Sequence, residues 1–555
     1  MPQSYSVKYP PSAVVDFVIV GSGAAGGVLA KELSVAGFAV VVLEKGPRLR
    51  PEQFAHDEYR YLFQNEIGFK TPVTWREHAK QVATPASFND GMRGIWAAQV
   101  VGGSSVHFTA NFWRFRPVDF DERSRLGAIP GASLADWPIS YDDLEPYYTK
   151  VDWEVGVSGA AGGWGEPRRS RPYPVPPLPV KSAGVLFERA AKKLGWHPFP
   201  APMAILSRPH NGRGACQSCG FCMGYGCEFG AKSSTLASMI PIAERTGRCE
   251  VRANCHVRKV ELDAKGRATG VIYFDAQGKE QLQRARAVVL ACNGAETPRL
   301  LLMSKNKHFP QGLANSSGMV GRHLMFNGGA IVPGLYEHPL NEYKGVQVTR
   351  IALDWYDSDA KRGFYGGGGL DARADLTLPI FWGLAGGAPG QRNWGSDYKA
   401  FLAHNFTRQM SVMGHTTSLP VESNTITLDP TLTDGHGLPA IRVTYRDHED
   451  DLKMTRFMQE RAREIHVAAG ARQVVDFPVG VSTSAAHLLG TCRMGNDPKT
   501  SVVDRFHRTH DVRNLFICDG SSLVTSGRGQ PTMTIMALAF RAGEHLAAFA
   551  RRGEI

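Results

Sequence analysis

Apolar and polar residues near the amino-terminal end alternate in a pattern that predicts a strand, a helix and a second strand. Residues 14–20 form an apolar, β-branched run, which is typical of a buried parallel strand. A helix is predicted over 27–37, and the next apolar run, 38–46, predicts a strand that contains Glu44 near its end. This order is typical of an α/β fold.

Later apolar runs predict that the same sheet receives strands from distant parts of the chain. Short runs separated by turns recur between 251 and 290, and a further strand is predicted at 441–448. The amphipathic pattern of 533–552 predicts a long helix. Glycine clusters at 365–369 and 383–391 predict loops.

The turn after the first strand carries three glycines in the pattern G-x-G-x-x-G. The first allows a tight turn, the second lets the backbone approach a pyrophosphate, and the third lets the helix pack closely on the strand. The helix N-terminus then directs its N–H groups and dipole at the phosphates. Glu44 lies 21 positions after Gly23, near the spacing at which a carboxylate binds a ribose hydroxyl. The predicted dinucleotide-binding residues are Gly21, Ser22, Gly23, Ala24, Ala25, Gly26, Glu44 and Lys45.

Two other segments carry a similar signal. Paired glycines and serines at 102–105 form a turn that can meet a phosphate or an isoalloxazine edge, although an ordinary Gly/Ser turn has the same pattern. A strand predicted at 513–519 ends in an Asp–Gly pair, and a Pro–Thr helix start follows it. Two phosphate-directed sites favour FAD, an extended ligand, over NAD. The further cofactor residues predicted are Gly102, Gly103, Ser104, His107, Val257, Asp519, Gly520 and Thr532.

The composition is that of an ordinary globular protein. Of 555 residues, 43% are hydrophobic and 21% charged, which allows two or more domains or one large discontinuous domain. The net charge of +11 comes from scattered Lys and Arg, so we expect no nucleic-acid partner, although a basic face for an acidic redox partner remains open. Neither a membrane span nor a signal peptide is predicted, so we expect a cytoplasmic protein, or a periplasmic one exported with a signal-bearing partner.

Several motifs together make the chain resemble the glucose–methanol–choline (GMC) oxidoreductases, over nearly its whole length. Within that family the Cys-rich segment and the residues after it are similar to the bacterial sugar dehydrogenases related to gluconate, fructose, glucose and glycoside-3 dehydrogenases. The stretch CNGAETP departs slightly from the family's second signature. The motifs are the glycine turn with Glu44, GGSS, CNGAETPRLLLMS (292–304), VGRHLM (320–325), HLLGTCRMG (487–495) and SVVD (501–504).

The resemblance implies an α/β fold in which a discontinuous, Rossmann-like FAD-binding domain carries an inserted α+β substrate domain built on an antiparallel sheet. We assign residues 1–125, 205–330 and 482–555 to the FAD-binding domain. The substrate-binding domain is assigned to 331–481, and 126–204 to a crossing segment.

The catalytic prediction combines residue chemistry with the resemblance. Oxidising an alcohol by hydride transfer to flavin requires a base with a pKa near 7 beside the hydroxyl, and imidazole is the side chain best suited to that role. In the resembling family the first His of H-x-x-G-T is this base, and it corresponds to His487. The family's second active-site residue, a His or Asn, corresponds to Gln530, which can orient a hydroxyl but cannot act as a base. His487 is therefore the predicted base.

His107 has two interpretations. Some sugar-oxidising relatives carry a His at the matching position and bond it covalently to the flavin. Other relatives keep this His without the bond, so that it merely lines the ring.

Four cysteines lie within the segment 214–232. In a chain without export signals, Cys-x2-Cys-x2-Cys with a fourth Cys nearby predicts metal binding rather than disulfides and matches an iron–sulfur pattern. The resembling sugar dehydrogenases hold a three-iron cluster in such a loop, although their spacing differs. A structural zinc site and a loop of free thiols are the alternatives. The predicted metal ligands are Cys216, Cys219, Cys222 and Cys227.

The sequence thus predicts FAD-dependent oxidation of a sugar or glycoside hydroxyl to a carbonyl, with C3 of a glycoside favoured by the resemblance. Electrons are expected to pass through an iron–sulfur cluster to a cytochrome c or quinone-linked acceptor, and the resemblance also implies a small chaperone-like subunit. One alternative is an oxidase that reduces oxygen and uses its cysteines structurally. The other is a non-catalytic flavin electron-transfer subunit, which an intact His487 disfavours.

Overall fold

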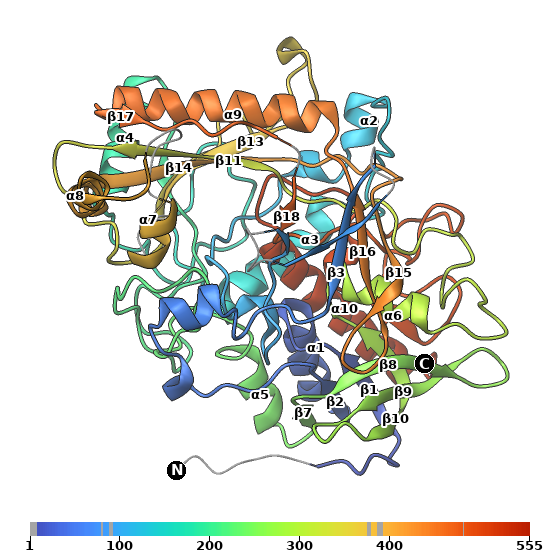
Figure 1. The fold of residues 1–555 in the computed structure, drawn as a ribbon. Helices are drawn as coiled ribbons and strands as arrows, with labels where there is room; N and C mark the ends of the chain where they lie inside the picture. The colour runs from blue at the N-terminus through green and yellow to red at the C-terminus, as the bar shows by residue number, and fades with distance from the viewer. Residues whose placement is uncertain (1–7, 79–81, 88–92, 374–378, 386–391, 481) are drawn as a thin grey trace.

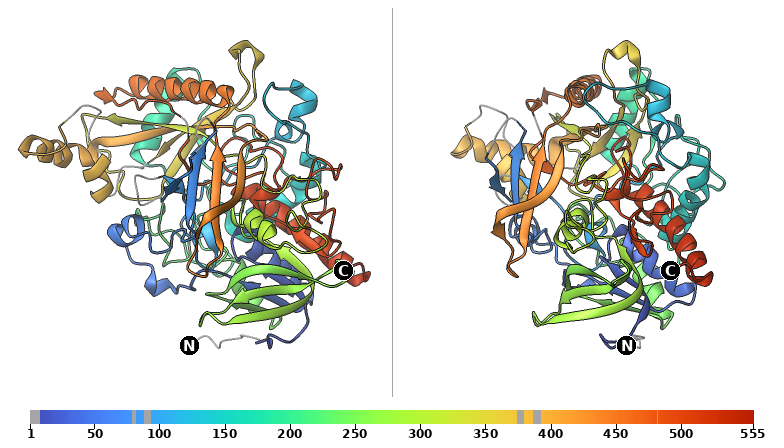
Figure 2. Two further views of the ribbon diagram at one scale, coloured as in Figure 1. Left: turned by 45° about the vertical axis from the view of Figure 1, so that its right-hand side comes forward. Right: turned by 90° about the vertical axis from the view of Figure 1, so that its right-hand side faces the viewer.

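The computed structural model describes residues 8–555 apart from 79–81, 88–92, 374–378, 386–391 and 481. A mixed sheet lies at the end of the molecule that holds the carboxyl terminus, and an antiparallel sheet lies at the opposite end (Figure 1). A third sheet stands between the two (Figure 2). Among the described residues, no helix combines the length and the apolar content that a bilayer crossing requires.

The first sheet gathers strands from three distant parts of the chain. Its order is β7-β2-β1-β10-β9-β8, and β19 also pairs with β10. The pairs among β7, β2, β1, β10 and β19 are parallel, whereas β9 and β8 continue the sheet antiparallel. The prediction that late strands join the first one is confirmed. The strands are β1 (Val15–Val20), β2 (Val40–Leu43), β7 (Cys249–Arg252), β8 (His256–Leu262), β9 (Ala268–Phe274), β10 (Glu280–Leu290) and β19 (Leu515–Ile517).

Helix α1 (Ala24–Val35) packs against both α5 (Met239–Arg245) and α10 (Thr532–Arg551), and α1 and α5 also contact strands of this sheet. Helix α10 comes close to α1 because a glycine lies at the contact. A Cβ on Gly543 would lie 2.7 Å from Cβ of Glu32. The predicted amphipathic helix therefore closes the dinucleotide-binding half rather than lying free on the surface.

The antiparallel sheet has the order β17-β11-β14-β13-β12-β6. Helices α4 (Ser182–Lys193) and α9 (Glu449–Ala468) cover it and share with it an apolar core. Figure 1 shows α9 lying across the outer face of the sheet. The strands are β6 (Phe199–Pro200), β11 (Gly329–Leu335), β12 (Val348–Ala352), β13 (Gly368–Arg373), β14 (Gln409–Thr416) and β17 (Gln473–Val474).

The third sheet, of order β15-β16-β3-β4, joins segments far apart in the sequence. β3 (Val73–Glu77) pairs on one side with β4 (Thr84–Ala86) and on the other with β16 (Pro439–Tyr445), which itself pairs with β15 (Thr425–Thr433). The strand predicted at 441–448 is thus found here. This sheet joins residues that we assigned to different domains by sequence.

The glycine cluster at 365–369 is only partly a loop, because Gly368 and Gly369 begin β13. Packing requires these glycines: a Cβ on Gly368 would lie 2.0 Å from the His415 carbonyl oxygen, and one on Gly369 would lie 2.2 Å from Cδ2 of Leu353. The cluster at 383–391 overlaps α7 (Pro379–Ala385), and its remainder lies outside the described residues. The remaining elements are α2 (Glu122–Leu126), α3 (Tyr141–Val151), α6 (Glu296–Met303), α8 (Ser396–Asn405), β5 (Gly94–Ile95) and β18 (Ser484–Ala485).

A buried ion-pair network fixes the segment that precedes α10. Arg528 is fully buried and binds Oδ1 of Asp119 through Nη1 at 2.5 Å, the carboxylate of Glu122, and the carbonyl oxygen of Tyr356 through Nε at 2.9 Å. The Tyr356 hydroxyl donates to Oδ2 of Asp119 at 2.6 Å. One guanidinium thereby joins three separate chain segments.

Replacing Arg528 with Met should destabilise the fold by about 3–5 kcal/mol, because two buried carboxylates lose their counter-charge. The matched control is Arg125→Met, which breaks the exposed ion pair with Asp121 and should cost about 0–1 kcal/mol. Urea unfolding followed by tryptophan fluorescence gives both values. Equal midpoints for the two variants would show that the network contributes no net stability.

Candidate active site

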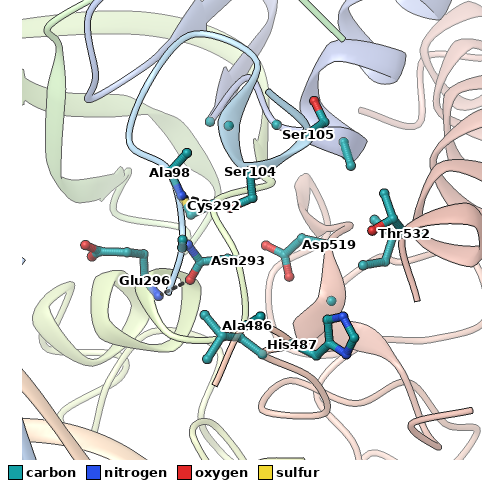
Figure 3. Close-up of a pocket in the computed structure, with 18 of the residues that line it drawn as sticks. Ala98, Ser104, Ser105, Cys292, Asn293, Glu296, Ala486, His487, Asp519 and Thr532 are labelled. Atoms are coloured by element: carbon teal, nitrogen blue, oxygen red, sulfur yellow. Dashed lines mark hydrogen bonds between the residues drawn. The ribbon is translucent and has the colours of Figure 1, made fainter. Parts of the chain in front are cut away.

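A cavity of roughly 390 Å³ runs from the turn after β1 to the antiparallel sheet. Distant segments of the chain line it, and Figure 3 shows side chains from several of them facing one space. Ser104 and Ser105 come from the 102–105 turn, Cys292 to Glu296 from the segment after β10, and Asp519 and Thr532 from the carboxyl-terminal region. The shape is that of a site for an extended ligand.

The glycine turn has the geometry that the sequence predicts. Gly21 has a φ of +95°, which favours glycine, and a Cβ on Gly26 would lie 1.9 Å from the Gly21 carbonyl oxygen. At Gly23 the nearest atom to a Cβ would be Cα of Gly103 at 3.9 Å, so an added methyl group would occupy the cavity rather than clash with the fold. Gly23 therefore keeps open the space that a pyrophosphate would fill.

Both helix N-termini beside the cavity lack side-chain caps. Gly23 precedes α1 and Pro531 precedes α10, and neither residue supplies a side-chain acceptor. The first N–H groups of each helix therefore remain for a ligand, and each helix dipole favours an anion there. This donor set fits the two phosphates of FAD.

Glu44 lies at the end of β2 with its carboxylate held in place. Oε2 accepts hydrogen bonds from the N–H and the hydroxyl of Ser22, the latter at 2.7 Å, and Oε1 accepts from the N–H of Gly46 at 2.9 Å. Burial raises the pKa of Glu44, although these hydrogen bonds oppose the shift. Oε2 thus accepts two hydrogen bonds, whereas Oε1 accepts one and keeps a lone pair that can accept from a ribose hydroxyl.

Most predicted cofactor residues line the cavity, and three do not. Ser22 and Gly102 support the wall: the Gly102 N–H donates to the Ser22 hydroxyl at 2.9 Å. Gly26 packs the helix onto the turn instead. The residues that do line the cavity are Gly21, Gly23, Ala24, Ala25, Glu44, Lys45, Gly103, Ser104, His107, Val257, Asp519, Gly520 and Thr532.

Cys292 also lines the cavity. Asp519 is fixed nearby, because its carboxylate accepts from the hydroxyl of Thr297 at 2.6 Å and from the N–H of Ser521 at 2.8 Å. Burial raises the pKa of Asp519.

His487 and Gln530 line the same cavity at its other end, as the sequence predicts. Nδ1 of His487 lies 3.0 Å from Oδ1 of Asn327. Because an amide oxygen only accepts, this contact places the proton on Nδ1 and leaves Nε2 as an acceptor. Burial, with smaller contributions from His415 and Arg373, lowers the pKa of His487 to about 4. This pKa lies below the value near 7 expected of the base from the sequence, because burial disfavours the charged imidazolium. His487 is therefore neutral near pH 7.

Three residues that the sequence did not single out stand beside His487. Arg373 on β13 and His415 on β14 line the cavity, and Asp371 on β13 links them. Asp371 Oδ2 lies 2.6 Å from His415 Nε2 and 2.6 Å from Arg373 Nη2. Although burial alone would raise the pKa of Asp371, Arg373 and His415 hold it well below its ordinary value. The i, i+2 spacing of 371 and 373 was a signal for one face of a strand, but their pairing with 415 depends on the register of β13 and β14.

His107 is buried at the cavity wall with its ring edge-on to Trp96 at 5.3 Å. Burial, together with the nearby charge of Lys232, lowers its pKa to about 3. Its carbonyl oxygen accepts the N–H of Gly224 at 2.8 Å. The Cys-rich segment thus lies directly against His107, and covalent attachment of flavin at this residue stays a prediction.

Metal binding by the Cys-rich segment stays a prediction. Within the part of the chain that the structure describes, no three His, Cys, Asp or Glu side chains are grouped to hold a metal ion. Cys222 is buried, whereas Cys216, Cys219 and Cys227 are half-buried. Burial raises the pKa of Cys222 to about 12, with Lys232 opposing and the other three thiols adding to the shift.

The comparisons with known proteins agree with this geometry. Two family models described as GMC oxidoreductase match residues 15–326 and 420–539. The chain belongs to the GMC oxidoreductase family. It is accordingly an FAD-dependent oxidoreductase that acts on CH–OH groups, and the residues described above are those that would hold FAD.

Three curated relatives match nearly the whole chain. The 2-methyl-1,2-propanediol dehydrogenase of Mycolicibacterium austroafricanum is 34% identical over 96% of this chain and 95% of its own. The gluconate 2-dehydrogenase flavoprotein of Pantoea cypripedii is 30% identical, covering 95% and 92%. The fructose dehydrogenase large subunit of Gluconobacter japonicus is 30% identical, covering 95% and 97%.

A solved structure, the pyridoxine 4-oxidase from Mesorbium loti, is similar in fold. The TM-score is 0.63 at 18% identity, and the match covers 96% of this chain and 98% of that one.

Two glycine variants should separate folding from cofactor binding. Gly26→Ala should lower stability and flavin content together, because its methyl group meets the Gly21 carbonyl oxygen. Gly23→Ala should keep its thermal midpoint as apoprotein but lose most of its FAD, because its methyl group enters the cavity. Flavin absorbance per protein and thermal unfolding measure both effects. A fully loaded Gly23→Ala variant would contradict the assignment of the phosphate position.

Proposed function

We propose that this protein oxidises a hydroxyl group of a sugar or glycoside to a carbonyl. The observation that carries the proposal is the neutral His487, whose Nε2 is available at a cavity end lined by polar groups, including Gln530, Asn327 and Arg373. A polar wall of this kind suits a polyhydroxy substrate better than a hydrocarbon alcohol. The relatives named for gluconate and fructose support the same class. C3 of a glycoside is the carbon we favour, on the resemblance described above.

The chemistry assigned to the side chains is proton transfer and positioning. As the C–H bond breaks, the hydroxyl proton passes to Nε2 of His487, which becomes an imidazolium, while Asn327 holds Nδ1 and so fixes the ring. Gln530 can orient the hydroxyl through its amide. Bound FAD would supply the acceptor for the hydride, so that alcohol and oxidised flavin yield carbonyl, reduced flavin and one proton.

Replacing His487 with Asn should slow flavin reduction by about 10²–10⁴-fold with FAD still bound. The measurement is stopped-flow bleaching of flavin absorbance without oxygen, with D-fructose, D-gluconate and methyl glucosides as substrates. The matched control is His466→Asn. His466 is also buried, and its pKa is lowered to about 4, but it binds Tyr336 and the Val332 carbonyl away from the cavity. Unchanged reduction rates in His487→Asn would remove this residue as the base.

The pH dependence should follow the protonation of His487. A base must be neutral to accept a proton, and a lowered pKa keeps His487 neutral down to about pH 4. Flavin reduction should therefore be constant from neutral pH to about pH 5 and fall below about pH 4. A loss of rate already centred near pH 6.5 would show that the base is not a desolvated histidine.

The electron acceptor is proposed to be a partner such as a cytochrome c or a quinone-linked protein, rather than oxygen. A relative is named as a large subunit, which supports a multi-subunit assembly. The segment 214–232 supports an exit on its side of the molecule, because Gly224 contacts His107 and Met223 lines the cavity. The oxidase alternative keeps the same reductive chemistry and differs only in the reaction of reduced flavin.

Iron bound by the four thiols stays a prediction, which metal analysis and Cys222→Ser test together. If the thiols hold an iron–sulfur cluster, protein purified without oxygen contains iron, and Cys222→Ser keeps sugar-dependent flavin reduction while transfer to cytochrome c falls. Structural zinc would instead cause loss of folding and flavin together. A protein without iron whose folded Cys222→Ser variant transfers electrons normally would favour the oxidase.

A further inference from the structure

Two histidines lie at the substrate end of the cavity, His487 and His415. The oxidation proposed above assigns a role only to His487. His487 comes from the segment after β18, and His415 comes from β14 of the antiparallel sheet. Both line the same cavity, and each is close enough to the other for His415 to lower the pKa of His487. Because buried polar groups are normally hydrogen-bonded, the second imidazole needs a hydrogen-bond partner of its own.

Asp371 decides which nitrogen of His415 faces that partner. The carboxylate is fully buried and held in a bidentate pair by Arg373, with Nε to Oδ1 at 2.7 Å and Nη2 to Oδ2 at 2.6 Å. Asn111 donates to Oδ2 at 3.2 Å. An ionised Asp371 only accepts, so Nε2 of His415, 2.6 Å from Oδ2, carries the proton. Nη2 of Arg373 also lies 3.0 Å from this nitrogen, but it already donates to Oδ2 at the shorter distance of 2.6 Å. Nδ1 of His415 is then a bare acceptor.

The ring of His415 is fixed so that Nδ1 lies beside the segment that carries Gln530. Gly529 has a φ of +108°, and a Cβ there would lie 2.8 Å from Cβ and 3.0 Å from Nδ1 of His415. Trp113 meets the ring edge-on at 5.5 Å. Within the described part of the chain, no hydrogen bond of Nδ1 is found. The structure therefore aims a second acceptor at the cavity without satisfying it internally.

One hydroxyl cannot satisfy both imidazoles. A hydroxyl has a single proton and donates one hydrogen bond, which His487 Nε2 takes from the hydroxyl that is oxidised. A bare Nδ1 on His415 requires a second O–H, because an acceptor left unpaired in a desolvated site is unfavourable. A hydroxyl on the neighbouring carbon is the group that a polyhydroxy substrate would bring.

We propose that His415, oriented by Asp371, is a specificity-determining residue that binds the hydroxyl next to the one being oxidised, so that the enzyme selects vicinal diols. This inference rests on the proposed oxidation of a polyhydroxy alcohol and names the feature of the substrate that the cavity recognises. Removing the neighbouring hydroxyl should therefore cost about 10- to 100-fold in kcat/KM, the range expected for one hydrogen bond in such a site.

The test compares two alcohols that differ by one hydroxyl, 2-methyl-1,2-propanediol and 2-methyl-1-propanol. Flavin reduction in the holoenzyme without oxygen gives kcat/KM for each. The wild type should prefer the diol by about 10- to 100-fold, and His415→Leu should bring the ratio of the two kcat/KM values to within about threefold of one. Asp371→Asn, which keeps the ring but removes the charge that fixes its tautomer, should also lower the ratio. His466→Gln is the control and should leave it unchanged.

A second readout does not depend on turnover. In holoenzyme labelled with ¹⁵N-histidine, the signal lost in His415→Leu should show Nε2 protonated and Nδ1 bare at neutral pH. Adding the diol should shift this Nδ1 signal, and adding the mono-alcohol should not. If the leucine variant does not fold, the wild-type ratio and the Asp371→Asn ratio still decide.

The outcomes separate this inference from the function on which it rests. Equal wild-type rates with the two alcohols, an unchanged ratio in a folded His415→Leu variant, or a protonated Nδ1 would each overturn the role of His415 while leaving alcohol oxidation intact. Diol binding at Nδ1 without any flavin reduction would support the role of His415 and count against the proposed oxidation. No reduction and no shift of Nδ1 would overturn both.

Discussion

The turn between β1 and α1 is the constraint on which the rest of the site depends. No side chain fits between this turn and the start of α1, since a Cβ on Gly26 would lie 1.9 Å from the Gly21 carbonyl oxygen. The helix therefore starts directly against the strand end, and its uncapped N–H groups face the cavity. Gly23 leaves the space in front of them open. The remaining walls are built around this phosphate position, from Glu44 at one side to the start of α10 at the other.

The antiparallel sheet places charged side chains at one end of the cavity, and the other end has the geometry of a phosphate-binding site. Arg373 and His415 contribute to the lowered pKa of His487, so the base stays neutral without an acidic neighbour in direct contact. The carboxylate that balances the charge of Arg373 is Asp371, which is held in place by contacts with Arg373 and His415. The dinucleotide-binding half positions the flavin. The antiparallel sheet carries His415, the residue proposed to distinguish one alcohol from another. Arg528 holds the segment before Gln530 in place between the two halves.

The sequence predicts best what is local along the chain. The glycine turn, Glu44 and the two helix starts are each encoded within a few consecutive residues, and the strands of the first sheet follow from apolar runs. Three further features could not be found in this way. The grouping of Asp371, Arg373 and His415 depends on strand register. The glycines at 368 and 369 are predicted to lie in a loop, although close packing in β13 requires them. The four thiols have a metal-like spacing, but the spacing does not determine where each side chain points.

The central claim is that this chain oxidises a CH–OH group by moving the carbon-bound hydrogen to flavin while a histidine takes the proton. The most direct measurement is the rate of anaerobic flavin bleaching with D-fructose or D-gluconate carrying deuterium at every carbon, compared with the unlabelled sugar. The account predicts that flavin is bleached and that the deuterated sugar reacts several-fold more slowly, because the C–H bond breaks in that step. Bleaching at the same rate with both sugars in single-turnover mixing, or a flavin that no polyhydroxy alcohol reduces, would contradict it.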